Sequence, residues 1–215
     1  MNDFKQEFIK FAISKDILRF GEFKTKAGRL SPYFFNAGLF NDGDSLHKIG
    51  QFYAKAILDA QLPFDMLFGP AYKGIPLVSA ISISLSEIGN NYPFCFNRKE
   101  VKDHGEKGSL IGAPLSGDIL IIDDVISAGT SIRESVDLIS MASARPCGVV
   151  VSLDRMERGE NGLSAIQEIQ NIYNIPVISI INLDDLINYM RIKDNLAFNL
   201  KAVENYRSQY GIKVN

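Results

Sequence analysis

The stretch ILIIDDVISAGTS, residues 119–131 of 215, decides which fold this chain can adopt. Its four aliphatic residues predict a buried parallel strand, and Asp123 and Asp124 follow at the carboxyl end of that strand. The small residues after them leave backbone N–H groups uncovered where a helix should begin, which suits a phosphate. Because open α/β sheets bind ligands at the carboxyl ends of their strands, the stretch indicates a sugar-phosphate site.

Strands and helices alternate on both sides of this stretch. Expected strands cover 65–68, 93–96, 119–122, 147–153 and 177–181, and expected helices cover 3–19, the segment from the turn at 41–44 to residue 63, 74–89, 131–144 and 163–173. Ser131 and Glu134 match a capping box at the start of the helix at 131–144. Two or three short helices should finish the chain. The alternation predicts an α/β fold with a central, mostly parallel sheet flanked by helices.

The whole chain, 1–215, is expected to form a single domain of ordinary size. Residues 41–181 carry the alternation and should form the α/β core. Residues 1–40 do not fit it, and we expect them to form a hood over the sheet together with the C-terminal helices. Residues 98–117, RKEVKDHGEKGSLIGAPLSG, are rich in basic residues and glycine, which predicts a flexible loop that acts as a lid or a binding element.

Composition excludes several classes of function. A formal net charge of −2 argues against a general nucleic-acid binder, because such proteins need a basic face. No apolar run approaches the ~18 residues that would span a bilayer. The N-terminal MNDFKQEF lacks the apolar region of a signal peptide. Cys95 and Cys147 form no CxxC pair and fall in expected strands, which is typical of core cysteines in a reducing compartment. We therefore expect a cytoplasmic protein with no membrane or nucleic-acid partner.

Two other strand ends carry charged side chains. FGPAYKGIP, residues 68–76, places Tyr72 and Lys73 near a helix start, where a lysine can neutralise a phosphate. The same residues also fit an ordinary strand–helix turn with a solvated lysine. Arg155 follows the strand at 147–153, and its guanidinium fork suits an anionic substrate. The alternative for Arg155 is a surface turn held by salt bridges, and the sequence leaves both pairs of alternatives open.

The acid pair also fits other classes of protein. An apolar strand ending in acids describes the magnesium-binding strand of P-loop NTPases, but the GxxxxGK[ST] motif of that class is absent. Helix or turn capping is the structural alternative. His47 and His104 are too far apart in sequence to suggest a zinc site, and no GxSxG marks a nucleophilic serine. A loop histidine such as His104 is more often solvated than functional.

The stretch at 119–131 resembles the phosphoribosyl-diphosphate signature of the type I phosphoribosyltransferases. Four other segments, spread in order through nearly the whole chain, are similar to the orotate phosphoribosyltransferases: KAGRLSPYFFNAG, FGPAYKGIP, FNRKEVKDHGEKG and SLDRMERG. The resemblance implies transfer of ribose 5-phosphate from phosphoribosyl diphosphate (PRPP) to orotate, giving orotidine 5′-monophosphate and pyrophosphate in UMP biosynthesis. It also implies Mg²⁺ and a homodimer with shared active sites, in which the catalytic loop at 98–117 reaches the neighbouring site.

The same resemblance assigns roles by position. Asp123 and Asp124 would hold the ribose hydroxyls, and with Lys102 they are the expected catalytic residues. No protein side chain is expected to bind the metal directly, because Mg²⁺ would be held mainly through PRPP and water. Orotate would contact Phe34, Phe35, Ser127 and Arg155, the last of which faces its carboxylate. PRPP would contact Lys26, Tyr72, Lys73, Arg98, Lys99, Lys102, His104, Asp123, Asp124, Val125, Ile126, Ser127, Ala128, Gly129, Thr130 and Ser131.

The chain departs from the family pattern at two of these segments. Ser127 stands where the family usually has threonine, and it keeps the hydroxyl while losing a methyl group. Lys107 stands where glycine is common, which should stiffen the catalytic loop slightly.

Two other functions share part of the pattern. A phosphoribosyltransferase acting on a purine or uracil would need the acid pair, but a neutral base offers no carboxylate to Arg155. A regulator that senses PRPP and binds nucleic acid would carry a basic face or an added DNA-binding domain, and the net charge of −2 argues against it.

We expect Lys102→Ala to lower kcat far more than it weakens PRPP binding. A single flexible cation in the catalytic loop helps chiefly when negative charge develops on the departing diphosphate, so its removal acts on the transition state. Steady-state kinetics with orotate and PRPP measure both quantities. A variant with near-normal turnover would remove Lys102 from the mechanism.

Overall fold

The computed structural model describes residues 3–25, 28–102 and 108–212. The strands are β1 (Leu18–Lys24), β2 (Leu30–Phe35), β3 (Met66–Gly69), β4 (Phe94–Lys102), β5 (Gly108–Gly112), β6 (Asp118–Ile122), β7 (Arg145–Asp154) and β8 (Val177–Asn182). The helices are α1 (Asp3–Ser14), α2 (Gly43–Ala60), α3 (Gly74–Glu87), α4 (Thr130–Met141), α5 (Ala165–Tyr173), α6 (Leu183–Arg191) and α7 (Ala197–Tyr210), with short 3₁₀ helices η1 (Ala37–Leu39) and η2 (Asp194–Leu196).

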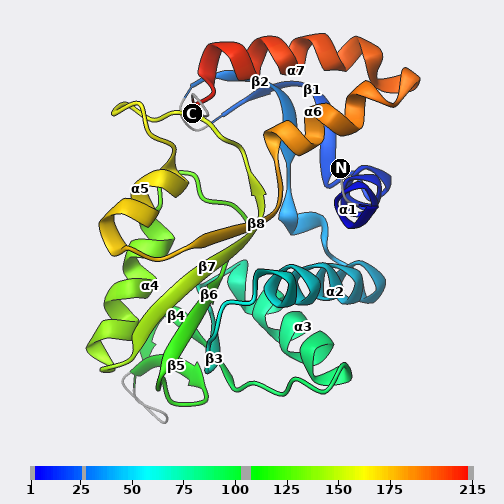
Figure 1. Ribbon diagram of the computed structural model, residues 1–215. Coiled ribbons are helices and arrows are strands. Elements are labelled where there is room, and N and C mark those ends of the chain that lie inside the picture. The colour runs from blue at the N-terminus through cyan, green and yellow to red at the C-terminus, as the bar shows by residue number, and fades with distance from the viewer. Residues whose placement is uncertain (1–2, 26–27, 103–107, 213–215) are drawn as a thin grey trace.

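The central sheet has the strand order β5-β4-β3-β6-β7-β8. β5 runs antiparallel to β4, and all the other neighbours in this sheet are parallel. Helices α2 and α3 cover one face and α4 and α5 cover the other, as Figure 1 shows. The prediction of a mostly parallel sheet flanked by helices is therefore confirmed.

Strand β6 lies in the middle of this sheet and explains why the aliphatic run is unbroken. The four residues from Ile119 to Ile122 are fully buried. Ile119 and Ile121 belong to the apolar cluster under α4 and α5, whereas Leu120 and Ile122 belong to the cluster under α2 and α3. Because both faces of the strand are covered, it needs apolar side chains at every position instead of at alternate ones.

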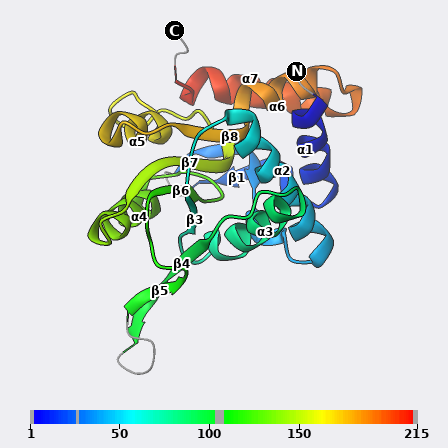
Figure 2. The ribbon, with the colours of Figure 1, turned by 60° about the horizontal axis from the view of Figure 1, so that its bottom comes forward.

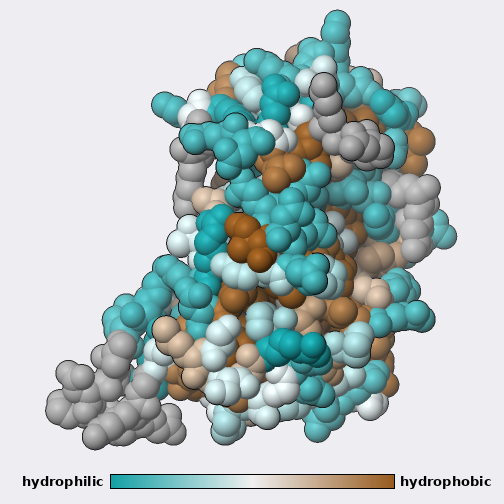
Figure 3. Space-filling view, turned by 60° about the vertical axis from the view of Figure 1, so that its left-hand side comes forward, coloured by the Kyte–Doolittle hydropathy of each residue, from teal (hydrophilic) through white to brown (hydrophobic). Residues whose placement is uncertain are grey.

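The segments expected to form the hood lie together at the side of the sheet where the parallel strands end (Figure 1). β1 and β2 form a separate antiparallel pair, and α7 packs against β2. Ion pairs join the helices, since Lys5 Nζ of α1 lies 2.7 Å from Asp185 Oδ2 and Arg207 Nε of α7 lies 2.9 Å from Asp184 Oδ1. Seen from the side of α4 and α5, the surface mixes hydrophilic side chains with smaller hydrophobic patches (Figure 3). Across the described ranges, no helix is both long enough and apolar enough to cross a membrane.

The first helix is shorter than the predicted range of 3–19. α1 ends at Ser14, and β1 has begun by Leu18. Asp16 adopts φ 56°, its N–H bonds to the Ile13 carbonyl at 3.1 Å, and the Ile17 N–H bonds to the Ala12 carbonyl at 2.9 Å. These contacts form a Schellman motif, which closes a helix at a left-handed residue. Aspartate is one of the few residues other than glycine that adopts this conformation, so the helix stops before Gly21.

The structure also corrects the prediction of a flexible loop at 98–117, because strands occupy part of this segment. β4 continues to Lys102, and β5 returns antiparallel to it, with Asn97 opposite Leu110 and Lys102 opposite Gly108. Residues 103–107 lie outside the described part of the chain. The resulting β4–β5 arm, residues 97–112, projects from the body of the molecule in Figure 2. The partner strand supplies hydrogen bonds that the polar composition of this segment does not reveal.

The capping box predicted at Ser131 and Glu134 is wrong. α4 begins at Thr130, and its N-cap is Gly129, which has φ 72° and no side-chain cap. The Ser131 side chain instead forms a hydrogen bond with the carboxyl group of Asp123. The local sequence pattern matched a cap, but the Ser131 hydroxyl is used instead by the carboxyl group of Asp123, which follows β6.

We expect Gly69→Ala to destabilise the fold. A methyl group at Gly69 would clash with the Gly74 carbonyl oxygen and the Val78 side chain, because α3 starts directly against the end of β3. Overpacking of this kind lowers the free energy of unfolding by about 1–3 kcal/mol. Gly43→Ala is the matched control, since nothing lies within 4 Å of a methyl group there. Denaturant unfolding compares the two, and equal stabilities would contradict the packing argument.

Candidate active site

The acid pair lies at the end of β6, beside β7. The Asp123 N–H bonds to the Val150 carbonyl at 3.1 Å, and the Ser152 N–H bonds to the Asp124 carbonyl at 2.8 Å. Both aspartates are nearly inaccessible, with 7% and 5% of their surfaces exposed. The Asp124 N–H also donates to Asp123 Oδ1 at 2.9 Å. Continued pairing with β7 therefore fixes the backbone from which the two carboxylates project.

The environment of Asp123 disfavours a second negative charge. Burial, followed by the neighbouring charge of Asp124, raises the pKa of Asp123 to about 7. Hydrogen bonds from the Asp124 backbone and the Ser131 side chain act in the opposite direction. Asp123 therefore holds its proton more tightly than an isolated aspartate does.

A buried tyrosine supports the acid pair from behind. Tyr53 on α2 is fully buried, and its Oη donates to the main-chain oxygen of Asp123 at 2.7 Å. The Ser152 hydroxyl lies 2.8 Å from the same Oη. The sequence places Tyr53 in the expected helix that follows the turn at 41–44 and gives it no role in the site. The signal that could have found it is general, because a buried tyrosine usually needs a hydrogen-bond partner.

The turn from 125 to 130 opens toward solvent at the start of α4. Ser127, Ala128 and Thr130 are exposed, whereas Gly129 is buried and left-handed. Arg133 of the first turn of α4 donates through Nη1 to the Ala128 carbonyl at 2.7 Å. The turn therefore has a fixed shape, and its small side chains leave the first N–H groups of the helix accessible to an anion.

The segment at 68–76 meets the acid pair directly. Lys73 Nζ lies 2.5 Å from Asp124 Oδ2, so the lysine has a partner and is not simply solvated. The side chain of Lys73 is 51% exposed, which leaves part of the ammonium group open to a ligand. Tyr72 Oη donates to Glu100 Oε1 at 3.0 Å, and Lys99 Nζ lies 5.4 Å from the Tyr72 ring. This segment thus joins the acid pair to the β4–β5 arm.

Other expected PRPP contacts fall on or near the arm. Arg98 is half-buried on β4, and its Nε is buried without a hydrogen-bond partner among the described residues. Lys99 is exposed, as expected for a side chain on the opposite face of the strand. Of Lys102, only the backbone at the end of β4 is described. Lys26 and His104 lie outside the described residues.

The two phenylalanines expected to contact orotate point to opposite sides of β2. Phe34 is 38% exposed, and its ring stacks on Phe23 with centroids 5.4 Å apart. Phe35 is buried, and its ring centroid lies 6.4 Å from that of Phe8. Successive side chains of a strand alternate in direction, so the structure does not bring these two rings to one side of the hairpin.

Arg155 lies just after β7, on the hood side of the sheet. Its Nε donates to Glu157 Oε1 at 2.7 Å, and its Nη2 donates to Ser31 Oγ of β2 at 3.0 Å. The salt-bridge alternative for this segment is therefore present, but the pair is largely buried, with exposed fractions of 16% and 18% for the two side chains. It is not the solvated surface turn that we had set against a binding role.

The donor set suits Mg²⁺ that arrives with a phosphorylated ligand. Among the described residues, no three histidine, cysteine, aspartate or glutamate side chains gather as a metal cluster. Mg²⁺ that is held mainly through substrate phosphates and water, as the resemblance implies, requires no such cluster.

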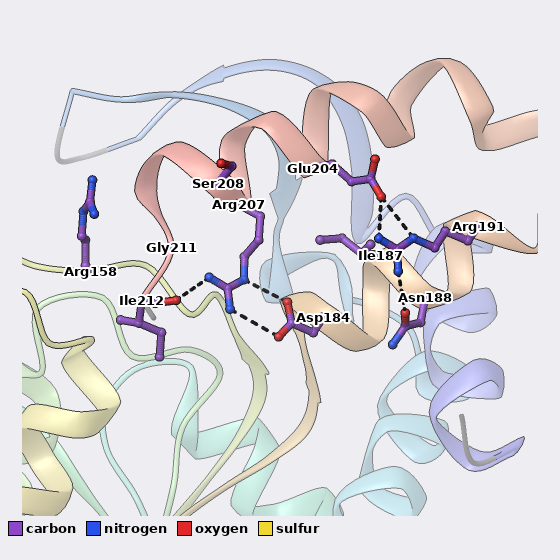
Figure 4. Close-up of a pocket in the computed structure, with 10 residues that line it drawn as sticks. All are labelled: Arg158, Asp184, Ile187, Asn188, Arg191, Glu204, Arg207, Ser208, Gly211 and Ile212. Atoms are coloured by element: carbon purple, nitrogen blue, oxygen red, sulfur yellow. Dashed lines mark hydrogen bonds and ion pairs between the residues drawn. The ribbon is translucent and has the colours of Figure 1, made fainter. Parts of the chain in front are cut away.

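A cavity of about 470 Å³ lies between α6 and α7 (Figure 4). Two ion pairs cross it, Arg191 with Glu204 at 2.7 Å and Arg207 with Asp184 at 2.9 Å. None of the residues expected to bind PRPP or orotate lines this cavity. It therefore belongs to the packing of the two helices and is separate from the acid pair.

Comparisons with known proteins show which family this chain belongs to. The phosphoribosyl transferase domain family matches residues 39–178, which include the acid pair and the segment at 68–76. The orotate phosphoribosyltransferase of Nitrosospira multiformis is 67% identical over 214 residues, which cover 100% of this chain and 94% of that protein. The chain belongs to the orotate phosphoribosyltransferase family. Another orotate phosphoribosyltransferase, from Nitrosomonas europaea, is 61% identical over 100% of this chain and 94% of its own length.

The fold agrees with the same family. The crystal structure of orotate phosphoribosyltransferase from Francisella tularensis matches with a TM-score of 0.86 and 42% identity, covering 95% of this chain and 99% of that one. The expected type I phosphoribosyltransferase fold is confirmed, and the resemblance of the five sequence segments to the orotate phosphoribosyltransferase family is confirmed with it.

We expect Asp123 to make the fold less stable as the pH rises from about 4 to about 7. Its pKa is raised to about 7 in the folded chain, so the native state holds a proton here that the unfolded chain has already released. Stability from this group is therefore complete below pH ~4 and is lost by pH ~7. Asp123→Asn should lose less thermal stability than the wild type between pH 5 and pH 8.

Asp118→Asn provides the control for this experiment. The hydrogen bond from Arg145 lowers the pKa of Asp118, so its contribution is lost only as the pH falls below the usual aspartate range. Its loss should not change the slope between pH 5 and pH 8. Identical slopes for Asp123→Asn and the wild type would contradict the assignment.

Proposed function

We propose that this chain transfers ribose 5-phosphate from PRPP to orotate, giving orotidine 5′-monophosphate and pyrophosphate in de novo pyrimidine biosynthesis. One observation carries the proposal: a buried acid pair at the end of β6, in contact with Lys73, in a chain that matches orotate phosphoribosyltransferases along its whole length. Carboxylates accept hydrogen bonds from ribose hydroxyls, and the exposed turn before α4 can donate to the 5′-phosphate.

Two anion-binding elements, the turn before α4 and the loop that carries Lys73, lie on either side of the reacting carbon. Asp123 and Asp124 hold the ribose, the turn from Ser127 to Ser131 holds the 5′-phosphate, and Lys73 is placed to meet the diphosphate. Tyr72 lies beside it and links this group to the β4–β5 arm through Glu100. Holding the sugar at both ends aligns the anomeric carbon with the attacking nitrogen of orotate, which lowers the entropic part of the barrier.

Charge stabilisation supplies the rest of the catalysis. Displacement at the anomeric carbon develops positive charge on the sugar and negative charge on the departing diphosphate. Asp123 and Asp124 stabilise the first, and Lys73 with Arg98, Lys99, Lys102 and His104 of the arm stabilises the second. Bound Mg²⁺ supplies further positive charge for the leaving group. Orotate attacks as an anion, so little proton transfer is needed.

The arm also supports a homodimer with shared active sites. It projects from the body of its own subunit (Figure 2), so a second copy is the natural recipient of Lys99 and the other basic residues of its sequence. Closure of the arm over the substrates would exclude water, which would otherwise hydrolyse PRPP. Cys95 and Cys147 are both free, which fits the reducing cytoplasm as the compartment of the enzyme.

The acceptor base is tested by an ultraviolet assay with PRPP and Mg²⁺. Orotate should be consumed, whereas uracil, adenine and hypoxanthine should not. Consumption of one of these neutral bases in place of orotate would overturn the assignment of the acceptor, and consumption of none of the four would overturn the activity.

We expect Arg155→Ala to raise KM for orotate and to leave KM for PRPP near its wild-type value. A hydrogen bond to a charged group contributes about 1.5–3 kcal/mol, which corresponds to roughly a 10- to 100-fold increase in KM. Arg191→Ala is a control that removes another paired arginine, on α6, outside the site. Unchanged saturation by orotate would reject a role for Arg155 in binding its carboxylate.

A further inference from the structure

The guanidinium of Arg155 is held on several sides before any ligand binds. Nε and Nη2 both approach Glu157 Oε1, at 2.7 and 2.6 Å. Nη2 also donates to Ser31 Oγ, whose own proton is used on the Tyr33 carbonyl at 2.7 Å. The ring of Tyr33 lies under the guanidinium, 4.3 Å from its central carbon to the ring centroid. Such a side chain has lost most of its rotational freedom.

Glu157 is the residue that these contacts share with the hood. Its Oε1 accepts a hydrogen bond from Tyr206 Oη of α7 at 2.9 Å, in addition to the hydrogen bond and ion pair with Arg155. Its Oε2 lies 3.6 Å from Arg29 Nη1, just before β2. The Glu157 side chain is only 18% exposed, and its negative charge is compensated by two arginines and a hydroxyl. Glu157 therefore links the end of β7 to α7 and to the residue before β2, which both belong to the hood.

The contacts with Glu157 and Ser31 engage Nε and Nη2 of the guanidinium. Glu157 occupies the edge formed by Nε and Nη2, and Ser31 takes one further hydrogen of Nη2. Nη1 takes part in none of these contacts. A carboxylate that approached Arg155 would therefore meet Nη1 at the end of the fork, where it could bind without displacing Glu157.

We propose that Glu157 is a positioning residue that fixes Arg155 for the carboxylate of the acceptor base. The inference rests on the proposed function, in which Arg155 faces that carboxylate. A free arginine side chain carries about 2 kcal/mol of rotamer entropy, and immobilising it in advance removes that cost from substrate binding. Glu157 thereby strengthens binding of a carboxylated base without touching it.

The opposite role would give the opposite sign. If Glu157 were a resident carboxylate that orotate must displace from Arg155, its removal would tighten orotate binding. If it positions Arg155, its removal weakens orotate binding and leaves PRPP binding alone. The direction of the change in KM for orotate therefore decides between the two.

The test compares Glu157→Ala and Glu157→Gln with the wild type in the orotate assay. Glu157→Ala should raise KM for orotate on the order of ten-fold, by analogy with the loss that follows removal of an outer partner that orients a metal ligand. Glu157→Gln keeps one acceptor oxygen and should give a smaller rise. In both variants kcat and KM for PRPP should stay near the wild-type values. Tyr206→Phe, which removes a hydroxyl that contacts both Glu157 and Arg155, should shift KM for orotate in the same direction.

Glu204→Ala is the matched control, because it breaks another arginine–glutamate pair, between the middle of α7 and Arg191 at the end of α6. It should leave KM for orotate unchanged, and thermal unfolding of all variants reports any general loss of structure. A fall in KM for orotate, no change, or equal rises for orotate and PRPP would each overturn the positioning role. Failure of the wild type itself to consume orotate would instead overturn the proposed function.

Discussion

Two adjacent carboxylates at the end of a fully buried strand are the constraint on which the rest of this site depends. Taking a charge out of water is costly unless opposite charges and hydrogen bonds replace the solvent. Around Asp123 and Asp124 that replacement comes from separate parts of the chain: Lys73 from the loop after β3, Ser131 from the first turn of α4, and backbone N–H groups at the site itself. The compensation is partial, and the proton affinity of Asp123 stays high.

Close backbone approach makes this arrangement possible. Gly74 lies so near the end of β6 that a methyl group on it would come within 2.9 Å of the Ile122 carbonyl oxygen. With glycine there, the loop after β3 packs directly against the strand that ends in the acid pair. The lysine one position earlier can then reach Asp124. The small residues of this loop serve geometry, and the charged residue between them serves chemistry.

Much of the core and the centre of the site could be predicted, because the relevant information is local. The run from Ile119 to Ile122 specifies a doubly covered strand, and the acids after it specify its functional end. Features that depend on distant partners could not be predicted. Ser131 had a suitable capping partner nearby in sequence, but it forms a hydrogen bond with Asp123. The role of the Arg155–Glu157 pair depends on contacts with Ser31 and with the C-terminal helix, which are distant in sequence. Asp16 ended a helix whose apolar pattern continued, because Ile17, the next buried residue, caps that helix from the turn before β1.

Tyr53 blurs the usual distinction between residues that stabilise and residues that react. It lies wholly within the hydrophobic interior on α2, yet its hydroxyl donates a hydrogen bond to the main-chain oxygen of Asp123. A survey of substitutions across this chain would therefore find functional sensitivity reaching one full layer below the surface of the active site. A side chain buried away from any substrate can thus act on the site through the backbone that it holds.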